Sequence, residues 1–223
     1  QSDDFEIILE GVKDDVGNVS NFQGNVFRCK KCSHAFLSPV IKVSHLHLAY
    51  DGYHTHRSQN LTLASSAKRD LFSIFKDYYL FRYQKLASSK GRFIYFLTKL
   101  IPFLSFFLSR AVRFIKIPKN NKYPSLLDIG CGRGDFLLRA QYCGYKTTGI
   151  DFDPTTIEIA RSRDLDARVM EVGDLPESAM YDVITLNHVI EHVSDPLFVI
   201  KNIFSRLKKG GYFYIATPNF DCA

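Results

Sequence analysis

Apolar runs and helical spacing alternate along the second half of the chain. Five short, mostly apolar runs predict buried strands, and the stretches 135–142, 154–162 and 196–207 between them have the spacing of amphipathic helices. Strands and helices that alternate at this rhythm indicate a parallel, doubly wound α/β sheet. The predicted strands are Leu126–Ile129, Thr147–Ile150, Arg168–Val172, Val183–Leu186 and Tyr212–Ala216.

The first half follows other patterns, so we divide the chain into residues 1–60, 61–123 and 124–223. In the first segment, apolar runs at Phe5–Leu9 and Asn25–Arg28 beside turn residues predict short strands.

The middle segment is predicted to be helical. Its apolar residues recur at helical spacing between Leu71 and Leu100, and Pro102 should break or kink that pattern. A second helix is expected at Phe103–Ile115.

Charge divides the chain in the same place. Residues 1–123 carry 19 Lys/Arg and 9 Asp/Glu, whereas residues 124–223 carry 10 and 14. Most of the excess lies between residues 68 and 122, with 13 basic against 2 acidic residues. Two interpretations stay open: a helical cover packed on the sheet or over a ligand pocket, or a peripheral contact with a membrane or lipid-linked substrate. Nucleic acid is not favoured, because no groove-reading motif accompanies the charge.

Composition excludes several classes of protein. The 223 residues are 46% hydrophobic and 23% charged, as in folded domains. No apolar run is long enough to predict a spanning helix, and the first residues do not resemble a secretory signal. Five scattered cysteines do not form a disulfide scaffold, so we expect a reducing cytoplasm, with a location peripheral to the inner membrane if lipid is bound.

The strongest motif is a glycine loop between a predicted strand and a predicted helix. It reads Asp128-Ile-Gly130-Cys-Gly132-Arg-Gly134. Glycines permit a tight turn and close approach of a ligand, and the amides of the next helix favour an anionic group. A dinucleotide fingerprint would need its third glycine at Asp135, where an acid opposes a pyrophosphate. No Gly-Lys-Ser/Thr follows, which excludes a P-loop; a tight turn without a ligand remains the alternative.

Acidic and aromatic residues follow the next two strands. Asp151, at the tip of the second strand, can accept both hydroxyls of a ribose, and Phe152 can lie flat on a purine. Asp174 and Leu175, after the third strand, can meet the amine and the other face of that purine. The tips of parallel strands share one edge of the sheet, so these residues predict a nucleoside site beside the glycine loop.

These stretches together resemble the class I S-adenosylmethionine-dependent methyltransferases. The similarity covers residues 125–219 in the order of the family: LLDIGCGRGDFL, TTGIDFDP, VGDLP, YDVITLNHVIEHVSDP and LKKGGYFYIATPN. It implies strands one to five of a seven-stranded, Rossmann-like, mostly parallel sheet, with S-adenosyl-L-methionine as cofactor. In this chain we expect a knuckle-like segment and the basic helical cover to precede that sheet.

The resemblance also assigns roles by position. Asp128 and the backbone of Gly130–Gly134 would hold the methionine end of the cofactor. Asp151 would hold the ribose, and Asn187, at the end of the fourth strand, is assigned to the cofactor as well. The adenine would lie against Phe152, Asp174 and Leu175.

Three polar residues after the fourth strand are catalytic candidates. His188, Glu191 and His192 would share one face of a helical turn, near the methyl group. Three interpretations stay open. His188 or His192 is a general base for a hydroxyl acceptor; or the cluster binds a metal, as in the quinone O-methyltransferases it resembles, which carry an acid at the place of His188; or Glu191 and His192 only brace the loop.

Residues 27–39 resemble half of a zinc site. Cys29 and Cys32 have the spacing of two zinc ligands, but a structural site needs four. The segment is similar to the second knuckle of the zinc-binding module that precedes many sugar and surface-polysaccharide methyltransferases, which implies structural zinc. Two reduced cysteines without metal are the alternative. Further candidate ligands are His34, His45, His47, His54 and His56.

The leading hypothesis is methyl transfer to a small-molecule or glycan acceptor, a sugar hydroxyl in surface-polysaccharide synthesis. The alternatives are a deoxysugar C-methyltransferase, a quinone O-methyltransferase, and a non-catalytic cofactor-binding or partner protein on the same fold. Because the family sheet has two further strands and the module a first knuckle, we expect the chain to be truncated at both ends.

Overall fold

The structure is a computed structural model, and it describes residues 4–13, 23–39, 73–74, 76–79, 81–82, 89–101, 103–106, 113 and 123–219. The chain separates into two compact units. The first is Gln1–Ser58 with Pro218–Ala223, and the second is Gln59–Thr217. The finer division into three segments stays a prediction.

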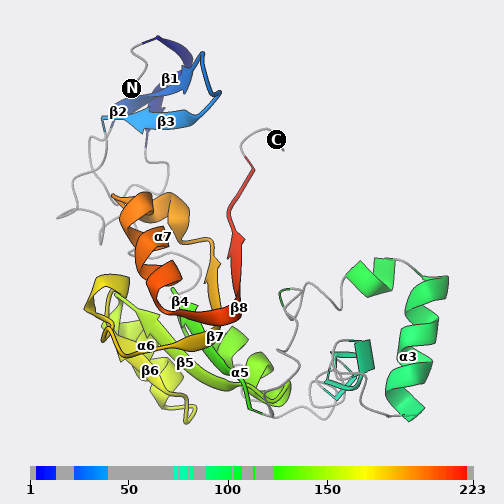
Figure 1. The fold of residues 1–223 in the computed structure, drawn as a ribbon. Coiled ribbons are helices and arrows are strands. Elements are labelled where there is room, and N and C mark those ends of the chain that lie inside the picture. Colours follow the sequence, from blue (N-terminus) through cyan, green and yellow to red (C-terminus); the bar gives the residue numbers. More distant parts are fainter. Residues whose placement is uncertain are drawn as a thin grey trace. The chain divides into compact units, whose positions relative to one another are not determined.

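An antiparallel sheet of three strands forms the described part of the first unit (Figure 1). Phe36 packs against the rings of Phe5 and Phe27, with ring centroids 5.2 and 5.7 Å away. The two strands expected here are confirmed, and a third, which was not predicted, is stabilised by these ring contacts and by pairing with the second. The strands are β1 (Phe5–Lys13), β2 (Gln23–Cys29) and β3 (Ala35–Ser38).

Helix α3, Ser89–Leu100, confirms the helical spacing of the middle segment. A Cβ on its Gly91 would lie only 2.6 Å from the carbonyl oxygen of Asp77, so glycine allows α3 to approach the helical residues 76–79. Residues 103–106 are again helical. Apart from Arg113, the rest of the predicted helix Phe103–Ile115 lies outside the described residues.

Five strands in parallel pairs form the sheet of the second unit, in the order β6-β5-β4-β7-β8 (Figure 1). The chain runs outward from β4 to β6 and then returns to the other side of β4 at β7. Open α/β sheets bind ligands where the strand order reverses in this way. The predicted doubly wound, Rossmann-like α/β fold is confirmed. The strands are β4 (Ser125–Ile129), β5 (Lys146–Asp151), β6 (Ala167–Val169), β7 (Tyr181–Asn187) and β8 (Leu207–Ala216).

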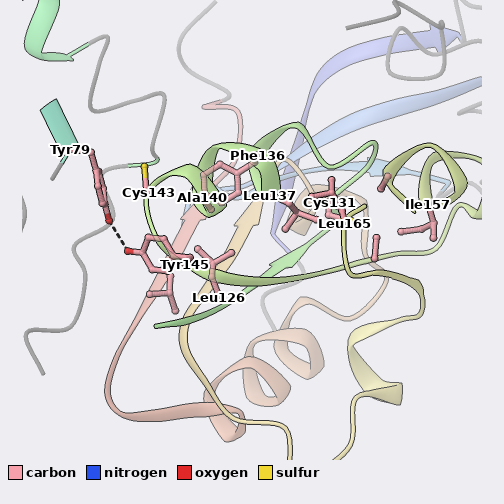
Figure 2. Packing of buried hydrophobic residues seen from close by; sticks show 13 residues of the cluster. Tyr79, Leu126, Cys131, Phe136, Leu137, Ala140, Cys143, Tyr145, Ile157 and Leu165 are labelled. Carbon is pink, nitrogen blue, oxygen red and sulfur yellow. Dashed lines mark hydrogen bonds between the residues drawn. The ribbon is translucent and has the colours of Figure 1, made fainter. Parts of the chain in front are cut away.

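Helices cover both faces of this sheet. Successive residues of a strand point to opposite faces, so neighbouring apolar residues pack against different helices. Leu126 packs with Leu137 and Ile157 of the helices on one face (Figure 2). Leu127, next in the strand, packs with Ile203 of the helix on the other face. The helices are α5 (Asp135–Tyr142), α6 (Pro154–Arg161) and α7 (Pro196–Ser205).

Two of these helices begin with the same dipeptide, Asp-Pro. Asp153 accepts a hydrogen bond from the amide of Thr155 at 2.8 Å, and Asp195 accepts one from the amide of Phe198 at 2.9 Å. A capping carboxylate followed by proline is a favourable helix start, so both helices begin where the sequence predicts.

Three predicted boundaries are wrong. The third strand ends at Val169 and not at Val172, because the chain turns into the single 3₁₀ turn η2, Val172–Asp174. The last strand begins at Leu207, five residues before its predicted start at Tyr212. These additional residues pair irregularly with β7, and Gly210 among them has a φ of 78°. Helix α7 therefore ends at Ser205.

Candidate functional site

Glycines with positive φ shape the loop between β4 and α5. Gly130, Gly132 and Gly134 have φ values of 69°, 52° and 79°, where residues with a side chain are strained. A Cβ on Gly130 would lie 2.2 Å from Val189 Cγ2. A Cβ on Gly134 would lie 2.3 Å from Leu165 Cδ1. Around the Cβ position of Gly132, no described residue comes within 4 Å, so this side of the loop is open.

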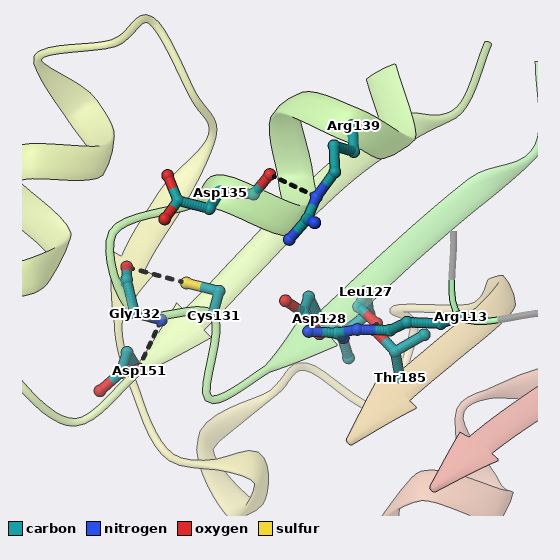
Figure 3. Close-up of polar contacts among 9 residues, drawn as sticks. All are labelled: Arg113, Leu127, Asp128, Cys131, Gly132, Asp135, Arg139, Asp151 and Thr185. Atoms are coloured by element: carbon teal, nitrogen blue, oxygen red, sulfur yellow. Dashed lines mark hydrogen bonds and ion pairs between the residues drawn. The ribbon is translucent and has the colours of Figure 1, made fainter. Parts of the chain in front are cut away.

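Asp151, the last residue of β5, is joined to this loop (Figure 3). Its Oδ2 accepts a hydrogen bond from the amide of Gly132 at 2.8 Å, and its Oδ1 accepts one from the amide of Asp153 at 3.1 Å. Burial raises the pKa of the Asp151 carboxyl, and the backbone hydrogen bonds counter that shift. The structure thus brings the residue predicted to bind ribose beside the open side of the glycine loop.

The residues predicted to contact adenine differ in exposure. Phe152 exposes 55% of its surface. Asp174 is exposed, and its Oδ2 accepts a hydrogen bond from the amide of Glu171 at 3.2 Å within η2. Leu175 is 5% exposed and belongs to the core beneath α7, so its side chain is not presented to solvent.

Phe198 of α7 is a further aromatic residue at this edge that the sequence analysis missed. It is 51% exposed, and its ring would lie 3.2 Å from a Cβ on Gly173. A signal for it was present in the sequence. Phe198 lies in the first turn of the helix that begins at Pro196, and it is not one of the core-facing residues Val199 and Ile203, so an aromatic side chain there is not needed for packing.

Asp128, the acid of the glycine motif, is 1% exposed. Its Oδ1 accepts a hydrogen bond from Thr185 Oγ1 at 2.5 Å and one from the guanidinium of Arg113 (Figure 3). Its Oδ2 is buried and has no hydrogen-bond partner among the described residues. Burial raises the pKa of Asp128, while Arg113 and Thr185 act to lower it. A buried oxygen of this kind is suited to a donor group on a ligand.

Arg113 was also missed by sequence reasoning. Its guanidinium carbon lies 3.6 Å from the centroid of the Phe136 ring in α5, and it forms an ion pair with Asp128. Its side chain is 14% exposed. Spacing gives no signal for this pair, because the two residues are 15 positions apart and Arg113 is one of many cations in the middle segment.

The structure brings the three catalytic candidates together around one carboxylate. His188 Nδ1 lies 3.5 Å and His192 Nε2 lies 3.9 Å from Glu191 Oε1. Glu191 Oε2 accepts a hydrogen bond from Thr217 Oγ1 at 3.2 Å. Both imidazoles are about half exposed, at 55% and 46%, so they are accessible to an acceptor.

The backbone around these candidates differs from the predicted helical turn. His188 has a φ of 55° and precedes a 3₁₀ turn, η3, at Ile190–His192. Its amide donates a hydrogen bond to the carbonyl of Ala216 in β8 at 2.8 Å. Asn187, the last residue of β7, is also paired with Ala216. The loop therefore leaves the sheet at its carboxyl edge and turns back on itself.

Cys29 is the last residue of β2, and Cys32 lies in the turn that follows it. The amide of Cys29 donates to the carbonyl of His34 at 2.9 Å, and the amide of Ser33 donates to the carbonyl of Cys29 at 2.8 Å. The first thiol is buried and the second exposed. Within the described part of the chain, no three His, Cys, Asp or Glu residues gather as a metal site. The candidates His45, His47, His54 and His56 lie outside it, so the zinc assignment stays a prediction.

The candidate cofactor residues thus gather mainly at the carboxyl ends of β4 and β5, with the His-Glu-His cluster after β7. An open glycine lets a ligand approach the backbone, and the carboxylates of Asp128 and Asp151 can accept hydrogen bonds from hydroxyl or ammonium groups. Imidazoles beside a carboxylate can take up a proton. The arrangement can hold a nucleoside that carries a cationic group, and it can place a proton-accepting imidazole in the loop after β7.

Comparison with known proteins agrees with this chemistry. A family described as "methyltransferase domain" matches residues 93–223, more than half of the chain. The chain is similar to a ubiquinone biosynthesis O-methyltransferase of Xanthomonas campestris pv. campestris, with 35% identity over 102 residues, 42% of this chain and 43% of the relative. A protein of the same name from Xanthomonas axonopodis is 34% identical over the same length. The chain therefore spans less than half the length of the curated relatives it matches.

Solved structures give more distant similarities. A SAM-dependent methyltransferase from Methanosarcina mazei is 27% identical, with 43% of this chain and 52% of that chain covered and a TM-score of 0.40. An S-adenosylmethionine-dependent methyltransferase from Mesorhizobium loti is 22% identical, with 43% and 47% covered and a TM-score of 0.40.

Proposed function

The chain belongs to the methyltransferase-domain family, and from this premise we propose that it binds S-adenosylmethionine and transfers the methyl group to an oxygen acceptor. One observation carries the proposal: the open side of Gly132 lies beside the half-buried carboxylate of Asp151. This pair offers both the space and the acceptor that the nucleoside of the cofactor needs.

The residues present fit this cofactor. The two amides that bind Asp151 fix its carboxylate, which would accept the ribose hydroxyls. The buried Oδ2 of Asp128 would accept a hydrogen bond from the ammonium of the methionine end, while Arg113 occupies the other oxygen. Phe152 and Phe198, both about half exposed, would contact the adenine.

The chemistry divides between cofactor and protein. When bound, S-adenosylmethionine supplies a methyl group on a positively charged sulfur, which is activated for displacement. The protein has to orient the acceptor, exclude water and remove the proton of the attacking hydroxyl. The imidazoles of His188 and His192 both lie near Oε1 of Glu191, and we propose that one of them takes that proton.

The acceptor that we propose is a sugar hydroxyl in surface-polysaccharide synthesis. Its support is the resemblance of residues 27–39 to the zinc-binding module that precedes sugar methyltransferases, and with it we propose structural zinc on Cys29 and Cys32. A quinol hydroxyl is the second candidate, because the chain is 35% identical over 102 residues to a protein named ubiquinone biosynthesis O-methyltransferase.

Two measurements test the proposal. Calorimetry with S-adenosylmethionine should show binding, and Asp151→Ala should weaken it. Labelled cofactor should then transfer methyl groups to one of three pools: nucleotide sugars, lipid-linked glycans or quinols. Label in the quinol pool alone would refute the sugar assignment. Binding without transfer to any pool would point to a non-catalytic protein, and absence of binding would refute the cofactor assignment as well.

A further inference from the structure

Helix α3 carries apolar residues on the side that faces solvent. Phe93, Phe96 and Leu100 are 63%, 58% and 64% exposed. Their spacing of three and four residues places them along one stripe of the helix. The buried residues of α3 are Gly91 and Thr98, which lie on the opposite side. A helix that covers a core has the reverse arrangement, with its apolar side inward.

The inward side of α3 is explained by contacts within the helical segment. A Cβ on Gly91 would clash with the Asp77 carbonyl oxygen. The ring of Tyr95 lies 5.3 Å from that of Phe81, and the guanidinium of Arg82 lies 5.5 Å from the same Tyr95 ring. These contacts determine which side of α3 faces the protein. They do not involve Phe93, Phe96 or Leu100, so they do not explain why α3 carries an exposed apolar stripe.

Cations lie on both sides of the stripe. At 100° per residue, Arg92 and Lys99 border it on one side and Lys90 on the other. The ammonium of Lys99 lies 5.4 Å from the Tyr95 ring centroid, at the boundary between the two sides of the helix. The sequence of α3, SKGRFIYFLTKL, contains no acid. An apolar stripe between basic borders is the pattern of helices that lie in the interface of an anionic membrane.

We propose that α3 binds the surface of an anionic phospholipid bilayer. Phe93, Phe96 and Leu100 enter the boundary between headgroups and acyl chains, while Lys90, Arg92 and Lys99 contact the anionic headgroups. Among the described residues, no helix combines the length and the apolar character needed to cross a bilayer. The 12 residues of α3 are too few to span a bilayer, so in our proposal the helix lies along the surface. This inference does not depend on methyl transfer.

Charge argues for lipid over a second copy of the chain. Residues 68–122 carry 13 basic and 2 acidic residues, so two copies joined through α3 would bring like charges together. An anionic bilayer pairs with these cations and accepts the aromatic side chains in the same contact. Dimerisation is therefore an outcome that the experiment has to separate from lipid binding.

Flotation with vesicles tests the proposal. The chain should float with vesicles of phosphatidylcholine mixed with phosphatidylglycerol, and much less with phosphatidylcholine alone. Lys90→Gln/Arg92→Gln should weaken binding about fivefold for each charge removed. Phe93→Ser/Phe96→Ser should weaken it at least about tenfold. The matched controls are Leu197→Ser and Lys201→Gln in α7, which change an exposed leucine and an exposed lysine away from α3.

Thermal melting of each variant verifies that the fold is retained, as expected for exposed positions. Equal binding to neutral vesicles, no binding by the parent chain, or unchanged binding by the folded α3 variants would each overturn the proposal. A parent dimer in sizing chromatography that Phe93→Ser/Phe96→Ser dissociates, without vesicle binding, would assign the stripe to a second copy instead.

Discussion

The amide of Gly132 donates a hydrogen bond to Oδ2 of Asp151 across 2.8 Å. This bond joins the turn after β4 to the tip of β5, its neighbour in the sheet. It places the open side of Gly132 beside a half-buried carboxylate. A ligand that lies against Gly132 must therefore also lie within reach of Asp151.

Gly132→Ala should remove cofactor binding and leave the fold intact. Alanine at a φ of 52° costs about 1–2 kcal/mol of backbone strain, but no described residue obstructs its Cβ. That Cβ would occupy the space proposed for the ligand. Gly144→Ala is the matched control, because Gly144 also has positive φ and open surroundings but lies in the turn between α5 and β5. Thermal melts should shift similarly for both, while calorimetry should show lost affinity for Gly132→Ala alone. Equal affinities would place the ligand elsewhere.

Cofactor affinity and the stability of the free protein should depend on pH in opposite directions. Burial raises the pKa of Asp151 above its ordinary value of 3.8. Its contribution to folding is therefore greatest below that value and is lost as the pH rises through the raised pKa. Cofactor binding needs the ionised carboxylate, so affinity should increase over the same interval. Calorimetry and thermal melts across the acidic range measure the two effects.

The control for this pH dependence is a second carboxylate close in sequence. Asp151→Asn should flatten the dependence of affinity on pH, because the titrating group is gone. Asp166→Asn should leave it unchanged, since Asp166 is exposed and is paired with Arg168. The same flattening in both variants would mean that Asp151 is not the group that controls binding.

Arg113→Met should destabilise the protein by about 3 kcal/mol, because it leaves the buried carboxylate of Asp128 without its cation. In the background of Asp128→Asn, the same change should cost at least about 1 kcal/mol less. Urea unfolding of the parent, the two single variants and the double variant gives this coupling. Equal costs in both backgrounds would show that Arg113 acts only through its packing on Phe136.

The sheet and its helices were largely predictable, because their signals are local. Helix α5 has the predicted bounds, since a glycine turn at Gly134 and the helical spacing after it define both ends. The end of β6 was missed, although the chain carried a local signal. Glu171 and Asp174 form a capping box around η2. The predicted strand was extended to Val172 because that residue is apolar, although Val172 belongs to η2.

Contacts between distant residues were not predictable in the same way. The residues that flank the glycine loop, Asp128 and Asp151, could be placed because parallel strands end at one edge. Arg113 could not be placed, because its partner is chosen by tertiary packing on Phe136 and not by spacing. The outward direction of the stripe on α3 likewise depends on which residues Gly91 and Tyr95 contact.

His188→Ala and His192→Ala, made singly, should distinguish a catalytic base from a structural brace. If one imidazole takes the acceptor proton, its loss should lower turnover by about 10²–10⁴-fold while cofactor affinity stays unchanged. Glu191→Gln should also lower turnover, because Glu191 Oε1 lies 3.5 Å from one imidazole and 3.9 Å from the other. Thr217→Val is the control, since it removes only the hydroxyl bound to the far oxygen of Glu191.

These variants also separate the other two interpretations of the cluster. A brace would appear as lower melting temperatures with normal turnover of the folded protein, and unchanged turnover in both histidine variants would rule out the base. A metal site would appear as loss of turnover by the parent chain on chelation and recovery with a divalent cation. His188 Nδ1 and His192 Nε2 lie 3.5 and 3.9 Å from Glu191 Oε1, and both imidazoles are about half exposed, so either one can reach an acceptor hydroxyl as the proposed base.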